Sequence, residues 1–102
     1  MTKILLIMVK QVIKRGRKKE PFRAEKLKRS IRDACRDIHV SGARAKTVVA
    51  KVSGPVLRSV ARRKSVKASM LRAKVLAGLR KVEPAAAKAW LRHEERRRAR
   101  RR

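Results

Sequence analysis

Residues 12–35 read VIKRGRKKEPFRAEKLKRSIRDAC, and the periodicity of their apolar side chains changes part-way along. The first half has a basic turn around Gly16 and then Glu20, Pro21 and Phe22, which predicts two short extended segments joined by a hairpin. The second half has apolar side chains at the spacing of one helix face: Leu27, Ile31, Ala34, Cys35 and Ile38. We therefore predict a pair of strands that leads directly into an amphipathic helix.

Three more helices are predicted by the apolar stripes that follow. Ser41 is placed to cap the second helix, and Gly54-Pro55 would end or kink it because proline lacks an amide hydrogen. The third helix should begin near residues 67–69 and end at Val82. Pro84 suits the first position of the fourth helix.

The predicted fold class is α+β, with a small N-terminal β-sheet or hairpin capping a bundle of about four helices. The strands should lie around residues 4–13 and 19–22, and Gly78 should let a neighbouring helix approach closely. We expect one core, formed by Leu27, Ile31, Cys35, Val49, Val52, Leu71, Val75, Leu79 and Trp90. Residues 1–94 form the predicted domain, and residues 95–102 form a basic C-terminal extension. Its last seven residues, 96–102, should be disordered in water because their arginines repel one another.

The composition points to a polyanionic partner. Of the 102 residues, 33 are Lys or Arg and 7 are Asp or Glu, which gives a formal net charge of +26. Such a charge opposes compaction unless anions screen it. Nucleic acid is the first candidate, because phosphate neutralisation releases counterions and rewards a high density of cations.

A family resemblance rests on three short sequences within residues 12–35: VIKR, EPF, and KL followed by SI and Ala34. Together they resemble the ATP-cone domain, a nucleotide-sensing module of ribonucleotide reductases and of the repressor of their genes. The resemblance covers roughly residues 9–92. It implies four residues in contact with ATP: Lys14, Arg15, Glu20 and Lys26.

Several positions depart from the family pattern. Gly16-Arg17 replaces the Asp-Gly of the family hairpin, and Arg23 replaces the Asp that begins the first helix. Ala68 and Arg72 lie where the family commonly has small polar or His contacts. These departures weigh against nucleotide binding more than against the fold.

The favoured hypothesis is a non-catalytic RNA-binding structural protein, a small basic protein of the ribosome in the cytoplasm. Its partners would be rRNA phosphates and neighbouring ribosomal proteins, since double-helical RNA is recognised by backbone and shape. The predicted nucleic-acid contacts are Lys14, Arg15, Arg17, Lys18, Lys19, Arg62, Arg63, Lys64, Arg96, Arg97, Arg98, Arg100, Arg101 and Arg102.

Two alternatives stay open: an ATP- or dATP-binding regulatory domain, and a DNA-binding protein of the chromatin type. Catalysis is not expected, because no paired carboxylates and no nucleophile with a nearby base stand out. A metal cofactor is not expected either, since Cys35 is the single thiol and His39 and His93 are far apart. No membrane partner is expected.

Overall fold

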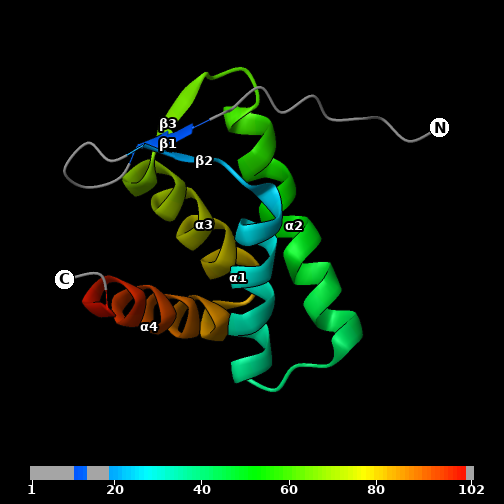
Figure 1. Ribbon diagram of the computed structural model, residues 1–102. Helices are drawn as coiled ribbons and strands as arrows, with labels where there is room; N and C mark the ends of the chain where they lie inside the picture. The colour runs from blue at the N-terminus through cyan, green and yellow to red at the C-terminus, as the bar shows by residue number, and fades with distance from the viewer. Residues whose placement is uncertain (1–10, 14–18, 101–102) are drawn as a thin grey trace.

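A computed structural model gives the structure of the protein, and it describes residues 11–13 and 19–100. Figure 1 shows how the elements are arranged. In chain order they are β1 (Gln11–Ile13), β2 (Lys19–Pro21), α1 (Ala24–Asp37), α2 (Gly42–Val60), β3 (Ser65–Lys67), α3 (Ala68–Val82) and α4 (Pro84–Arg100). The predicted helical bundle is confirmed.

Helix α1 ends in a left-handed turn. Its apolar face points into the bundle, where Ile31 and Cys35 are fully buried. His39 adopts a φ of 58°, a conformation that histidine enters more readily than most residues. This turn brings the Val40 amide to the Cys35 carbonyl at 3.4 Å, so one of the last carbonyls of α1 has a partner.

Helix α2 is one continuous helix, although Pro55 lies inside it. As predicted, Ser41 caps it: the Arg44 amide donates to the Ser41 hydroxyl at 3.1 Å. Arg44 also donates to Glu83 Oε1 at 3.0 Å and to the Val82 carbonyl at 2.8 Å. The start of α2 is thereby joined to the junction between α3 and α4.

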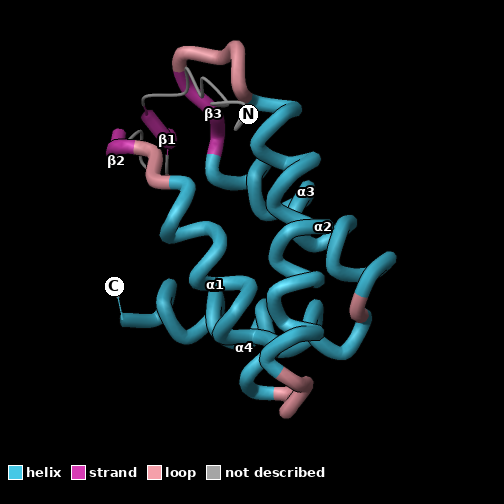
Figure 2. The backbone as a smooth tube through the Cα atoms, turned by 90° about the vertical axis from the view of Figure 1, so that its right-hand side faces the viewer, coloured by secondary structure: helices cyan, strands magenta, loops and turns pink. Residues whose placement is uncertain are grey.

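A three-stranded sheet lies beside one end of the bundle in Figures 1 and 2. Its strand order is β2-β1-β3, with β1 antiparallel to β2 and parallel to β3. The predicted second strand is present as β2, and part of the predicted first strand is present as β1. Residues 4–10 and the predicted hairpin turn lie outside the described residues. Strand β3 was not predicted from the sequence.

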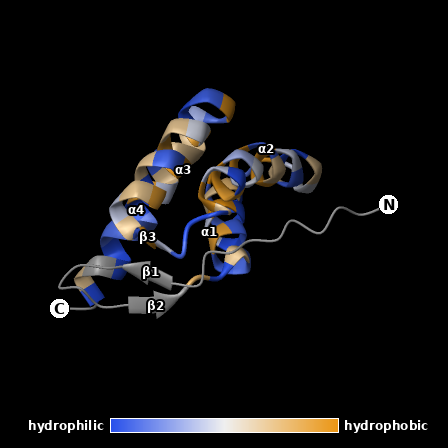
Figure 3. Ribbon diagram, turned by 90° about the horizontal axis from the view of Figure 1, so that it is seen from above, coloured by the Kyte–Doolittle hydropathy of each residue, from blue (hydrophilic) through white to orange (hydrophobic). Residues whose placement is uncertain are grey.

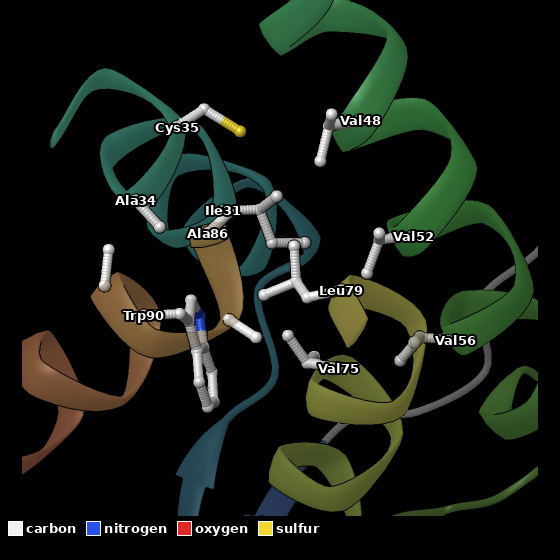
Figure 4. Close-up of a cluster of buried hydrophobic side chains, with 12 residues drawn as sticks. Ile31, Ala34, Cys35, Val48, Val52, Val56, Val75, Leu79, Ala86 and Trp90 are labelled. Carbon is white, nitrogen blue, oxygen red and sulfur yellow. The ribbon is translucent and has the colours of Figure 1, made fainter. Parts of the chain in front are cut away.

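The core lies between the four helices, and Figure 4 shows their side chains converging. Six of the nine predicted core residues are buried, whereas Leu27, Val49 and Leu71 are half-buried at its margin. Buried residues outside those nine complete it: Val48, Val56, Ala34, Ala86, Ala87 and Ala89.

Two residues show how closely the helices pack. A Cβ at Gly78 would lie 3.1 Å from Val52 Cγ1, so the predicted close approach of a neighbouring helix is confirmed. Trp90 is 4% exposed, and its indole Nε1 donates to the Ser30 hydroxyl at 3.0 Å. The Trp90 ring is therefore a core side chain, and no face of it is free to stack on a base.

The prediction of a disordered tail is wrong for residues 96–100, because α4 continues to Arg100. Arginine and alanine are good helix formers, and Arg97 lies 3.5 Å from Glu94 one turn earlier. Cations in the last turn also interact favourably with the negative end of the helix dipole. Figure 3 shows this end of the helix as strongly hydrophilic.

Candidate functional site

The register of the sheet gathers several elements at one edge. Ile13, at the end of β1, is paired with Lys19 at the start of β2 and with Lys67 at the end of β3. Helix α3 begins at the next residue, Ala68. The end of β1, the start of β2 and the N-terminus of α3 are therefore close together; below we call this place the sheet edge.

The N-terminus of α3 is suited to bind an anion. Lys67, at the N-cap position, makes no side-chain hydrogen bond to the helix, and no acidic residue lies in the first turn. The first amide hydrogens of a helix have no partner within it, and the helix dipole places positive charge there. Phosphate groups commonly bind at such helix ends.

Arg72 adds a second, independent feature one turn further along α3. Its Nε atom is buried and has no hydrogen-bond partner among the described residues. Ala68 and Arg72 are four residues apart, so they share a helix face, and side chains on a helix tilt toward its N-terminus. An anion at that end of α3 would give the buried Nε atom of Arg72 the partner it lacks.

This observation changes the interpretation of Arg72. From the sequence alone, we interpreted Arg72 as a departure from the family pattern that weighs against nucleotide binding. In the structure, Arg72 is a cationic donor on the helix that begins at the sheet edge, and its Nε atom lacks a described partner. Periodicity could not reveal this, because a buried donor without a partner is visible only once the helices are packed.

The structure describes two of the four residues that the family resemblance predicts to contact the nucleotide. Lys14 and Arg15 follow Ile13 directly in the sequence but lie outside the described residues. Glu20 is in the middle of β2, paired with Val12. Lys26 is exposed in the first turn of α1, and Figure 1 shows α1 and α3 both starting next to the sheet.

The predicted nucleic-acid contacts do not form one surface in the described part of the chain. Arg62, Arg63 and Lys64 are exposed in the loop before β3, which the register places at the edge opposite the start of α3. Arg63 Nη1 lies 3.5 Å from Met70 Sδ. Figures 1 and 2 show this loop far from the C-terminal end of α4.

The remaining predicted contacts are at the C-terminus or in residues 17–19. Arg96, Arg97 and Arg100 are exposed on α4, and Arg98 lies within the same helix. Lys19 begins β2. Arg17, Lys18, Arg101 and Arg102 lie outside the described residues, so their predicted role stays a prediction.

Cys35 is a buried core residue of α1. Desolvation raises the pKa of its thiol above the ordinary value of 9.0, and the charge of Glu83 adds to the effect while Arg44 opposes it. The thiol therefore stays protonated near neutral pH.

Within residues 11–13 and 19–100, no group of three His, Cys, Asp or Glu side chains could hold a metal ion. No helix there is long and apolar enough to cross a bilayer.

The ATP cone domain family matches residues 10–99 of the sequence. This chain belongs to the ATP-cone family. The resemblance inferred from residues 12–35 is thus confirmed and extends over nearly the whole chain. A search of curated proteins finds no significant match.

Membership of this family corrects the favoured functional hypothesis. ATP-cone domains are nucleotide-binding regulatory modules, so the prediction of an RNA-binding structural protein of the ribosome is wrong. The predicted association with the ribosome loses its support as well. High positive charge was the main argument for that hypothesis, and charge alone does not distinguish a polymer of nucleotides from a single nucleotide.

Proposed function

We propose that this protein is a regulatory domain that binds ATP or dATP at the sheet edge and catalyses no reaction itself. The observation that carries the proposal is the set of donors in α3: uncapped amides at its N-terminus and a buried Arg72 Nε without a described partner. Membership of the ATP-cone family supports the same ligand class.

In this proposal, the phosphates of the nucleotide lie at the N-terminus of α3. Helix amides and the Arg72 guanidinium donate to the phosphate oxygens, and such charge-assisted hydrogen bonds are about twice as strong as neutral ones. From the family resemblance, Lys14, Arg15 and Lys26 supply further positive charge. Glu20 is an acceptor suited to the ribose or the base.

The three strands have a structural role in the same proposal: they cap the bundle and cover the bound nucleotide. Strand β3 joins this cap to α3 without a linker, since Lys67 ends the strand and Ala68 begins the helix. A nucleotide held at the sheet edge would therefore contact both the cap and the bundle, and binding would fix one relative to the other. That coupling is the regulatory output that we assign to the domain.

Calorimetric titration with ATP and with tripolyphosphate, at physiological salt, tests the proposal. Tripolyphosphate carries the phosphate chain without adenosine, so a protein that merely attracts anions would bind both equally well. We expect ATP to bind at least about tenfold more tightly, a difference of about 1.4 kcal/mol. Equal affinities, or no binding of ATP, would refute nucleotide sensing.

A further inference from the structure

A concave surface lies between α1 and α2 and includes no residue of the sheet. It is a groove of about 520 Å³. Lys28 and Arg32 from α1 and Lys46 from α2 lie along it. Its apolar lining comes from α2: Val49, Ala50 and Leu57.

The groove is elongated, because the residues that line it on α2 extend from Lys46 to Leu57. The eleven steps between these two residues correspond to about 16 Å at a helical rise of about 1.5 Å per residue. Ala50 is exposed and has a small side chain, so a partner backbone could come close to α2 there, whereas the Arg58 guanidinium lies 3.3 Å from where a Cβ of Gly54 would be. A long, shallow channel between two helices is the shape that binds another helix through its apolar face.

The charge of the groove selects among partners. Three of its lining residues are cationic, and none of those in the described part of the chain is acidic. A second copy of the chain would meet strong repulsion, since each copy has a formal net charge of +26. A phosphate backbone would satisfy the cations but leave the apolar lining uncovered.

We propose that the groove between α1 and α2 binds an amphipathic helix of a partner protein, with an apolar stripe flanked by Asp and Glu. The apolar stripe lies on Val49, Ala50 and Leu57. The flanking carboxylates pair with Lys28, Arg32 and Lys46. No residue that lines the groove belongs to the sheet edge, so binding of the helix can be tested without nucleotide.

Fluorescence anisotropy with a labelled synthetic peptide of about 18 residues, long enough to form a helix on binding, tests the proposal without any nucleotide. The peptide has leucines on one helix face and glutamates on both sides of it. A second peptide has alanines in place of the leucines, and a third has lysines in place of the glutamates. Titrations are made at physiological salt, which screens general attraction between exposed charges.

Two variants, with one matched control, locate the binding surface. Lys46→Glu reverses a charge in the groove, whereas Lys51→Glu makes the same change at an exposed position of α2 that does not line it. Ala50→Trp fills the groove from an exposed position. Circular dichroism verifies that all three variants are folded.

We expect the Leu/Glu peptide to bind and the other two peptides to bind at least about tenfold more weakly. Lys46→Glu and Ala50→Trp should each weaken binding at least about tenfold, because like charges and lost complementarity oppose docking, while Lys51→Glu should change it little. Equal effects of Lys46→Glu and Lys51→Glu would show attraction to net charge alone. That result, or equal binding of the alanine peptide, would overturn the proposal.

Discussion

Polar groups in the helical core have hydrogen-bond partners, whereas some of those in and near the sheet edge have none among the described residues. In the core, the Trp90 indole donates to Ser30, whose hydroxyl in turn donates to the Leu27 carbonyl at 2.7 Å. At the sheet edge, α3 begins without a side-chain cap, and Arg72 holds the one buried side-chain nitrogen or oxygen without a partner in the described residues. A buried donor without a partner costs stability, and a bound anion would supply the hydrogen bond that Arg72 Nε lacks.

The core should account for the largest effects on folding. Leu79 is fully buried where α1, α2 and α3 meet, and Leu79→Ala should lower the free energy of unfolding by about 2–5 kcal/mol. Leu76→Ala removes the same atoms from a half-buried position in the same helix and should cost clearly less. Urea denaturation of both variants gives the comparison; similar losses at the two positions would contradict the assignment of the core.

Loss of the hydrogen bond between Trp90 and Ser30 should have an intermediate effect. Trp90→Phe keeps an aromatic side chain but removes the donor, and we expect about 1 kcal/mol from the hydrogen bond, with a further loss from the smaller ring. A double-mutant cycle with Ser30→Ala isolates the pairwise energy. A coupling energy near zero would mean that the indole nitrogen contributes nothing to the core.

The smallest effect concerns Cys35 and depends on pH. Because burial raises the pKa of its thiol, the folded state holds the proton more tightly than the unfolded state. The contribution of the Cys35 thiol to the free energy of unfolding is fully present below the ordinary thiol pKa of 9.0. It is lost as the pH rises through the higher pKa that the thiol has in the folded state. Ellman's reagent should react much more slowly with the native protein than with the urea-unfolded protein; equal rates would show that the thiol is accessible.

Local signals in the sequence were sufficient for the helices. The spacing from Leu27 to Ile38, the Ser41 cap and Pro84 at a first helical position each act within a few residues, and all three predictions are confirmed. Strand β3 could not be found this way. Its three residues carry no pattern of their own, and they form a strand by pairing with β1, more than fifty residues away in the sequence.

The candidate site was predictable only in part, for a similar reason. The motif around residues 12–26 identified the family, and the family implies the ligand class. The contribution of α3 depends on register, which places Lys67 beside Ile13, and on packing, which buries Arg72 Nε. Net charge was misleading because it is spread over every helix and does not indicate which anion binds.

The central claim is that the sheet edge holds the nucleotide, and calorimetric titration of two matched variants with ATP tests it most directly. Arg72→Met removes the guanidinium whose Nε atom is buried, while Arg80→Met makes the same change at an exposed position of α3 in its last turn. Arg72→Met should weaken ATP binding at least about tenfold without lowering stability in the absence of nucleotide, because it removes an unpaired buried donor. Arg80→Met should bind ATP like the unmodified protein. Equal ATP affinities for the two variants would contradict a nucleotide site at the sheet edge.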